Sequence, residues 1–434
     1  MKKIIVVLAF LISCNLIFTG VSPAQSYVDA YRLSYQGMGF GARALGLGSA
    51  YTGVSNDFSA VYWNPAGLGQ IRLNEMSLGL SHYSYNNTAT FNGERETYSN
   101  SQTNLNSLGI VYPFPVQRGS LVFAIGYGRQ TDFTSALGFT GFNDSSQTIL
   151  FLPYLKQRAR ILEDGGVNNW TAAAAIEAVK NLYIGLSLSF LSGSYSFNKD
   201  YRESDILNKY YLYELDRKYT ITEDIGGFNA RLGILHVFPG NKGRIGINIK
   251  FPSYLTIKEN YSSTYRWLDD DPRFDSLSSY DGISEFDLRS PFVFSGGLSW
   301  NFGDLMLSGD VEYTDWTQME FRNTYADLID ENAVIKEKLK ATVNLRAGAE
   351  FSIPGSDLQL RAGFAYLPSP YTFDSAPNAQ KYITGGLGYI IEDALKFDIG
   401  YAYGFWDTDH ITYWAKTTEK IKTHNVVATV SYRF

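Results

Sequence analysis

The residues best suited to bind a ligand lie between positions 131 and 168, which the sequence presents as the longest loop of the chain. This stretch is unusually apolar for a loop, and three cations follow directly. Exposed apolar patches generally mark binding sites, and an acyl chain could lie on this one while a cation pairs with its carboxylate. The residues predicted to bind a hydrophobic ligand, neutral or anionic, are Phe133, Leu137, Phe139, Phe142, Ile149, Phe151, Leu152, Tyr154, Lys156, Arg158 and Arg160. Alternatively, these side chains only pack the loop onto the rest of the protein.

No pattern of residues indicates an enzyme. The four histidines show no metal-ligand spacing, and the chain has no Gly-x-Ser-x-Gly nucleophile motif. The acidic run at residues 269–271, with Asp275, is more typical of a solvated loop than of a Ca²⁺ site. We therefore expect no catalytic residue, no metal site and no cofactor.

Composition excludes further classes of protein. The 37 Lys and Arg against 43 Asp and Glu give a net charge of −6 and a pI near 5.4, which disfavours a nucleic-acid partner. Aromatic residues make up 15% and charged residues only 18% of the chain. The single cysteine, Cys14, lies in an apolar leader, so a secreted mature chain would have no disulfide and no thiolate zinc site.

The first 24 residues resemble a secretory signal peptide. Lys2 and Lys3 precede an apolar run that ends before Ser22-Pro23-Ala24, a cleavage pattern of small residues. An alternative is processing as a lipoprotein at Cys14. Beyond the leader, no apolar stretch is long enough to predict a transmembrane helix.

From about residue 71 to 434 the hydrophobic pattern repeats every two residues, as it does in β-strands. Residues 305–314 are an example, with Leu307 and Val311 on one face and Ser308 and Asp310 on the other. Alternation fits both a soluble sandwich and a membrane barrel, but the turn lengths decide between them. About fourteen strands are joined by alternating short and long connections, which is typical of an outer-membrane β-barrel with periplasmic short turns. The predicted long loops are residues 86–103, 131–168, 198–218, 261–286, 323–337, 369–378 and 407–419.

Alternation also predicts which charged residues face the lumen of this barrel. They could line a solute path, but such groups more often form paired networks that hold a plug. The residues concerned are Arg244, Lys250, Asp310, Glu312, Arg346, Glu350, Arg361, Lys396 and Asp398.

Two strands could open the wall. In residues 182–197 the apolar phase shifts after Phe190, as a β-bulge would cause. In residues 121–128 the inward side chains of Ala124, Gly126 and Gly128 are small, which favours packing against a plug over an open ligand space.

Residues 25–70 do not alternate and are rich in glycine, so we interpret them as a plug inside the barrel. The runs at residues 41–50 and 56–68, the latter containing Asn64-Pro65-Ala66-Gly67-Leu68, resemble the N-terminal hatch of the FadL/TodX family. Weaker matches lie at residues 246–253, 309–316 and 360–370. The last residues, which end in Phe434, resemble the β-signal of outer-membrane proteins.

The resemblance implies an outer-membrane passive transporter of long-chain fatty acids or other hydrophobic compounds, in the form of a fourteen-stranded barrel. Its loops would collect the substrate, and a lateral opening would release it into the membrane. Asn64, Pro65 and Ala66 would form the hatch, where Asn before Pro favours a rigid corner. We expect a monomer in contact with outer-membrane lipid. The same signature occurs in PorV/PorQ-type barrels, so a barrel that binds cargo proteins for secretion is the alternative.

Overall fold

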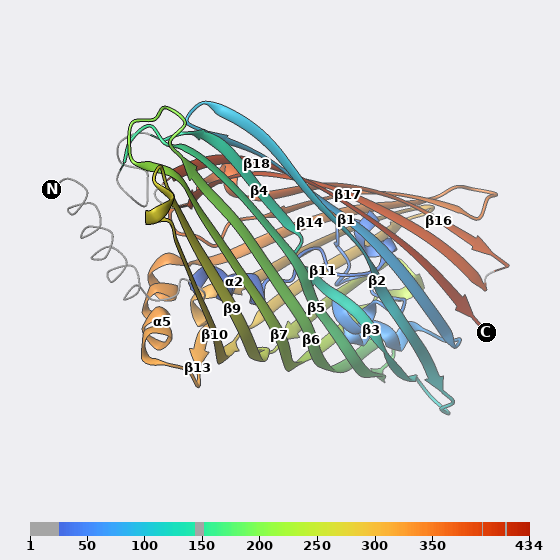
Figure 1. Ribbon diagram of the computed structural model, residues 1–434. Coiled ribbons are helices and arrows are strands. Elements are labelled where there is room, and N and C mark those ends of the chain that lie inside the picture. The colour runs from blue at the N-terminus through green and yellow to red at the C-terminus, as the bar shows by residue number, and fades with distance from the viewer. Residues whose placement is uncertain (1–25, 144–151, 393, 413–414) are drawn as a thin grey trace.

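The computed structural model describes residues 26–143, 152–392, 394–412 and 415–434. Its strands form a single closed antiparallel sheet, a β-barrel of tilted strands (Figure 1). The barrel closes where β1 (Glu75–Phe91) pairs with β18 (Ala415–Arg433) on one side and with β2 (Glu94–Phe114) on the other. The predicted all-β membrane barrel is confirmed.

The eighteen strand segments of the described residues build fourteen barrel strands, the predicted number, because four barrel strands are each interrupted once. In each case both segments pair with the same neighbouring barrel strand, as β3 and β4 both pair with β5. The interrupted strands are β3 (Leu121–Asp132) with β4 (Ser135–Phe142), β8 (Gly243–Lys250) with β9 (Tyr254–Asp269), β10 (Ser276–Arg289) with β11 (Val293–Phe302), and β12 (Leu305–Asp315) with β13 (Glu320–Arg322). The other strands are β1, β2, β5 (Lys156–Val179), β6 (Leu182–Ser204), β7 (Leu212–Val237), β14 (Ala341–Ser352), β15 (Leu358–Leu367), β16 (Gln380–Ile391), β17 (Leu395–Thr412) and β18.

The two faces of the sheet show that this is a membrane barrel. On β12, Leu307 and Val311 are exposed on the outer face, whereas Ser308 and Asp310 are buried on the inner face. Such an arrangement would be unfavourable in water but matches lipid outside and a polar lumen inside. Among the described residues, no helix is long and apolar enough to span a membrane.

Most of the predicted long loops are in fact strand. Residues 86–103 lie in the β1–β2 hairpin, residues 131–168 hold β4 and the first half of β5, and residues 198–218 lie largely in β6 and β7. Hydrogen bonding between strands continues past the membrane edge. The alternation of apolar and polar residues stops there because the outer face no longer meets lipid. Without that alternation, the sequence predicted a loop where the strand continues. The short turns at the other end, such as Lys180-Asn181, are confirmed.

Residues 26–70, here called the N-terminal segment, contain α2 (Tyr27–Ser34), α3 (Ala42–Gly46), α4 (Ala60–Trp63) and the 3₁₀ turn η1 (Pro65–Gln70). A capping box of Ser26 and Asp29 starts α2. The segment touches separate parts of the wall, α3 contacting β16, β17 and β18 while η1 contacts β5, β6 and β7, so it lies within the lumen (Figure 1). The helix α5 (Ala326–Lys338), which follows β13 in the chain, contacts α2 of the N-terminal segment. The remaining 3₁₀ turns are η2 (Pro239–Asn241), η3 (Pro272–Phe274), η4 (Trp316–Gln318) and η5 (Ala376–Asn378).

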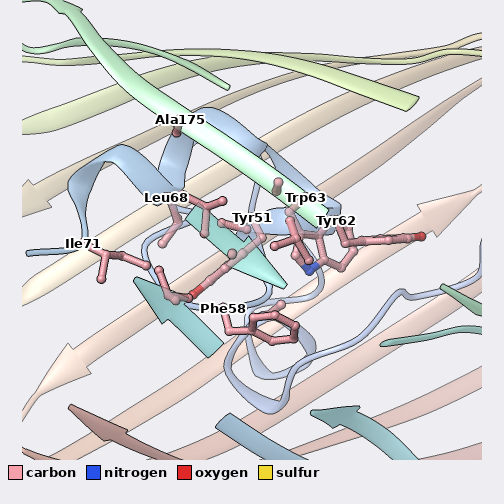
Figure 2. Packing of buried hydrophobic residues seen from close by; sticks show 14 of the residues in the cluster. Tyr51, Phe58, Tyr62, Trp63, Leu68, Ile71 and Ala175 are labelled. Atoms are coloured by element: carbon pink, nitrogen blue, oxygen red, sulfur yellow. The ribbon is translucent and has the colours of Figure 1, made fainter. Parts of the chain in front are cut away.

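An apolar core, the lower-lumen cluster, joins the N-terminal segment to the wall near the short turns (Figure 2). The small residues Gly109, Gly126 and Gly128 make room for it, because a Cβ at any of them would collide with the ring of Phe58 or Phe40. The small inward positions of β3 thus serve packing, as favoured. The cluster comprises Phe40, Ala44, Leu47, Tyr51, Val54, Phe58, Ala60, Val61, Tyr62, Trp63, Leu68, Ile71, Val111, Val122, Ala124, Ala173, Ala175 and Met306.

Candidate functional site

The three residues that the resemblance placed in the hatch form a buried corner between α4 and η1. Asn64 Nδ2 donates to the carbonyl oxygens of Thr52 at 3.0 Å and Ile234 at 3.2 Å, and Asn64 Oδ1 accepts from the Ala66 amide at 3.2 Å. Pro65 occupies the first position of η1, where its missing N–H costs nothing. One asparagine side chain therefore ties the corner to itself, to the preceding turn and to β7.

The wall is shaped to receive this corner. A Cβ at Gly185 on β6 would meet the backbone of Pro65 and Ala66, and one at Gly233 on β7 would meet the side chain of Asn64. Only glycine permits so close an approach of two backbones.

Charged side chains also hold the N-terminal segment, in a chain of ion pairs near the short turns. Arg43 donates Nε and one terminal nitrogen to the two oxygens of Glu350, both at 2.7 Å. Arg361 bridges Glu350 at 2.6 Å to Asp398 at 2.7 Å, and Asp398 also pairs with Lys396 at 3.3 Å. Every charge has a partner here, as buried charges require. The lumen-facing charges predicted from the sequence are confirmed as inward, and six of the nine, Glu312, Arg346, Glu350, Arg361, Lys396 and Asp398, are ion-paired.

A second apolar region, the upper-lumen cluster, surrounds α2 toward the long-connection end. Aromatic rings pack against one another in this cluster. The centroid of the Tyr31 ring lies 4.9 Å from that of Trp316 and 5.6 Å from that of Tyr371. Arg32 of α2 pairs with Glu223 at 2.8 Å and lies 3.5 Å above the ring of Tyr195. The cluster comprises Ala30, Leu33, Phe133, Val167, Leu191, Tyr195, Ile225, Leu255, Ile257, Phe286, Leu288, Trp316, Met319, Phe321, Leu328, Ile335 and Leu339, with Tyr27, Tyr31, Tyr35, Phe197 and Tyr371 packed against it.

Two buried cations lie at the base of this cluster. Arg231 and Lys250 face each other directly across β7 and β8 and are 5% and 1% exposed. Arg231 donates to Gln36 Oε1 at 2.8 Å and lies 4.2 Å above the ring of Tyr62, while Lys250 Nζ donates to Ser290 Oγ at 3.3 Å. Within the described residues neither has a carboxylate within ion-pair distance. The buried Glu312 carboxylate acts on both groups from a greater distance. Two adjacent buried cations without a carboxylate in direct contact are costly, so an anionic ligand would stabilise this site.

Lys250 was among the charged residues predicted to face the lumen, but Arg231 was not. The signal was present, because Asn229 and Arg231 occupy the inward phase of a strand whose outward phase carries Phe228, Leu232 and Ile234.

Three apolar residues of the predicted 131–168 loop, Phe133, Leu137 and Phe139, are buried instead of standing on an exposed loop. Phe133 is in the upper-lumen cluster, Leu137 packs with Ala89 and Ile161, and the ring of Phe139 lies 4.7 Å from Phe91. Phe142 and Leu152 are half-buried. Ile149 and Phe151 lie outside the described residues.

The cations of the same stretch lie on the opposite face from Leu137 and Phe139, although Lys156 stands opposite Phe142 in the ladder. Lys156, Arg158 and Arg160 are exposed, whereas the intervening Gln157 and Ala159 are fully buried. Because successive strand residues alternate faces, the three cations lie on the outer side of the barrel. Tyr154 is 53% exposed, beneath Lys209 Nζ at 3.7 Å from its ring. The expected single surface of all these residues is therefore not formed, because Phe133, Leu137 and Phe139 are buried inside the barrel whereas the three cations face outward.

A seam interrupts the wall between β2 and the β3/β4 strand. The β2–β3 ladder ends at Ser107 and Gly128, and β4 pairs only with β5. Side chains bridge the seam in place of backbone bonds, with Asn104 Nδ2 donating to Asp132 Oδ2 of β3 at 3.3 Å and Asn100 Nδ2 to the Ser135 carbonyl of β4 at 3.4 Å. Asn100 and Gln102 also reach past the seam to Asp164 Oδ1 of β5, at 2.8 and 3.0 Å.

A cavity of about 80 Å³ lies inside the wall at this level. Tyr35, Met38 and Gly39 of the N-terminal segment line it together with Arg129 and Asp132 of the seam. At this seam, side chains without a continuous ladder separate the lumen from the outside.

The expected bulge near Phe190 is absent. Phe190 is paired with Trp170 on one side and Phe228 on the other, and both ladders continue past it. The apolar phase changes because the surroundings change. Beyond Phe190 the outer face leaves the lipid at Ser192, while inward Leu191 and Tyr195 enter the upper-lumen cluster.

Comparison with solved structures shows that this barrel is similar in fold to toluene transporters and to a FadL homologue. The toluene transporter TodX of Pseudomonas putida is similar with a TM-score of 0.64 and 15% identity, over 92% of this chain and 99% of that chain. A FadL homologue of Pseudomonas aeruginosa gives 0.59 and 14%, over 92% and 100%. The toluene transporter TbuX of Ralstonia pickettii gives 0.55 and 19%, over 92% and 99%. No protein-family model and no curated protein sequence matches the chain.

The fold therefore defines a bacterial outer-membrane β-barrel of fourteen strands. More specifically, it is the FadL/TodX-type fold, as the motifs in the N-terminal segment indicated.

Proposed function

We propose that this protein is an outer-membrane channel for hydrophobic compounds, and that its preferred substrates are long-chain carboxylic acids. The substrate class is inferred from Arg231 and Lys250, two adjacent buried residues that have no carboxylate within 4.0 Å among the described residues. They lie next to an aromatic, apolar part of the lumen. An acyl chain in the upper-lumen cluster would bury apolar surface, and its carboxylate would supply the missing anion. A neutral hydrocarbon could use only the first of these interactions.

In this proposal α2 occupies the substrate site until a ligand displaces it. The helix fills the upper-lumen cluster with its own aromatic side chains, and Gln36, two residues beyond its end, contacts Arg231. A ligand that binds the space better than α2 does would shift the equilibrium toward the displaced helix.

Release is proposed to occur sideways, through the seam between β2 and β3/β4. The N-terminal segment acts as a plug that closes the direct path toward the short turns, and the corner at Asn64, Pro65 and Ala66 keeps it seated. The proposal rests on the interrupted ladder and on the cavity behind it. Separating the bridging side chains would open the wall without breaking a β-ladder.

The test is binding of a labelled long-chain fatty acid, and of the fatty alcohol of equal length, to detergent-purified protein. For the variant Arg231→Gln with Lys250→Gln we expect about tenfold or greater loss of affinity for the acid, because charge-assisted hydrogen bonds are lost. Affinity for the alcohol should be nearly unchanged. Lys258→Gln, which alters an exposed lysine paired with Glu285 at 4.0 Å, is the matched control.

Equal loss for acid and alcohol would contradict the assignment of the cations to the headgroup. Failure of every hydrophobic ligand to bind, together with recovery of exported proteins in a pulldown, would contradict the channel and favour a barrel that carries protein cargo.

A further inference from the structure

A row of lysines and aromatic rings crosses the outer face of three neighbouring strands. Lys381 on β16 pairs in register with Phe405 on β17, which in turn pairs with Lys422 on β18. Neighbouring strands lie about 4.8 Å apart, so the two lysines stand about 10 Å apart with the ring between them. Lys420 lies two residues beyond Lys422 on the same face of β18.

This row lies at the upper edge of the lipid-facing band. Ile383 and Tyr403 occupy the next row toward the middle of the barrel, and the exposed Tyr401 and Val426 follow. A step of two residues covers about 7 Å along a strand. Lys381 is at the end of β16 opposite the short turn to β17, and short turns are periplasmic. The lysines therefore stand where the head groups of the outer leaflet meet the protein.

The three lysines have no carboxylate partner. Within the described residues, none of them forms an ion pair within 4.0 Å, although Asp407 stands opposite Lys420 in the ladder. By contrast, Lys416 further along β18 pairs with Asp409 at 2.9 Å. A cluster of unpaired cations on a chain with a net charge of −6 is a local feature and not a consequence of overall composition.

We propose that Lys381, Lys420 and Lys422 bind the phosphate groups of a phosphorylated lipid of the outer leaflet. Two ammonium groups flanking an aromatic ring can approach one phosphate from both sides, while the exposed apolar residues below them contact the acyl chains. The site is on the outer wall, so it is separate from the lumen and independent of the transported substrate.

The experiment is a titration of the folded, detergent-purified protein with diphosphoryl lipid A, followed by native mass spectrometry at two salt concentrations. The test variant is Lys381→Gln, Lys420→Gln and Lys422→Gln. The control removes three other lysines, as Lys258→Gln, Lys336→Gln and Lys416→Gln, and so has the same net charge. Heat-modifiable electrophoretic mobility verifies that each barrel is folded.

We expect the affinity of the test variant for lipid A to be at least about tenfold lower, because each cation near an anionic surface raises the affinity severalfold. The control should bind like the parent, substitution of the same three positions by arginine should retain binding, and high salt should weaken it. Equal binding by test and control variants would overturn the proposal, as would equal binding of lipid A stripped of phosphate. If inorganic phosphate alone bound as tightly as lipid A, the site would be one for free anions and the lipid assignment would be wrong.

Discussion

The two halves of the lumen hold the N-terminal segment in different ways. Near the short turns, backbone packs on backbone at glycines, and every charge in the chain from Arg43 to Lys396 is paired. Around α2 many contacts are between side-chain rings, and within the described residues Arg231 and Lys250 have no carboxylate within 4.0 Å. The ion-pair chain of the lower half is complete within the protein, whereas in the upper half Arg32 is paired with Glu223 but Arg231 and Lys250 have no carboxylate within 4.0 Å among the described residues. The comparison suggests a fixed support below and an exchangeable occupant above.

The sharpest way to break the comparison is to leave a charge of the lower half unpaired. Glu350→Ala leaves Arg43 and Arg361 inside the lumen without this carboxylate, and removing one partner of a buried ion pair typically lowers the free energy of unfolding by about 3–5 kcal/mol. We expect the N-terminal segment to open, so that a reporter cysteine at Ser59 reacts with a thiol reagent on the order of a hundredfold faster or more. The parent without Ser59→Cys gives the background from Cys14.

Glu285→Ala is the control for this experiment, because its pair with Lys258 is long and exposed. Unchanged labelling in Glu350→Ala would show that the ion pairs do not seat the segment.

Two adjacent glycines of β11 test the close packing of backbones. A Cβ at Gly297 would meet Gly53 N at 2.6 Å and Thr52 Cβ at 2.8 Å, whereas one at Gly296 meets nothing within 4 Å. Gly297→Val should therefore loosen the segment by about 1–3 kcal/mol, as overpacking does. It would raise the labelling rate at Ser59→Cys about tenfold or more. Gly296→Val should be neutral, since valine suits a strand, and equal effects would refute the argument.

The seam can be tested by locking it. Asn104→Cys and Asp132→Cys, joined by a short reducible crosslinker, should hold β2 against β3 where their side chains now meet at 3.3 Å. If substrate leaves sideways, uptake of fatty acid by cells should fall severalfold and recover on reduction. Binding to purified protein should change little. If the crosslink left the rate of fatty-acid uptake unchanged, the substrate would leave by a route other than the seam.

The smallest expected effect is a pH dependence of the lower half. Burial raises the pKa of the Asp57 carboxyl, but Arg43, Lys396 and hydrogen bonds from Ser59 and Tyr51 together hold that pKa below its ordinary value. Its stabilising contribution is therefore complete above the ordinary carboxyl range and is lost as the pH falls through the lower folded pKa. Labelling at a reporter cysteine should accelerate below about pH 4, and Asp57→Asn should flatten this component. Because Ser59 itself bonds to Asp57, Ala60→Cys is the better reporter here.

Much of the fold could be predicted because a membrane barrel imposes strict rules on its sequence. Alternation at residues such as Leu307, Ser308 and Asp310 fixed which face meets lipid, and turn lengths led to fourteen strands. Prediction failed where lipid no longer constrains the outer face. At Lys156 and Arg158 a strand continues with polar residues on the outside, so the sequence indicated a loop.

The candidate site was less predictable for a different reason. Whether Lys250 is paired depends on which residues face it across the ladder and from the segment inside, and neither is encoded locally. The phase change after Phe190 shows the same limit, since one pattern fits both a bulge and an unbroken strand that passes from lipid into water.

By itself, the sequence determined the class of the protein, the number of strands, the inward charges and the motif around Asn64. It could do so because each depends on neighbours along the chain or on the two sides of a strand. Only the tertiary structure decided which charges are paired, where the wall lacks a ladder and that α2 fills the apolar lumen. These features depend on contacts between strands and with the N-terminal segment, several of them between residues far apart in the sequence, such as Gln36 with Arg231 and Tyr31 with Trp316. Their energies depend on distance and burial, which appear only when the barrel has closed.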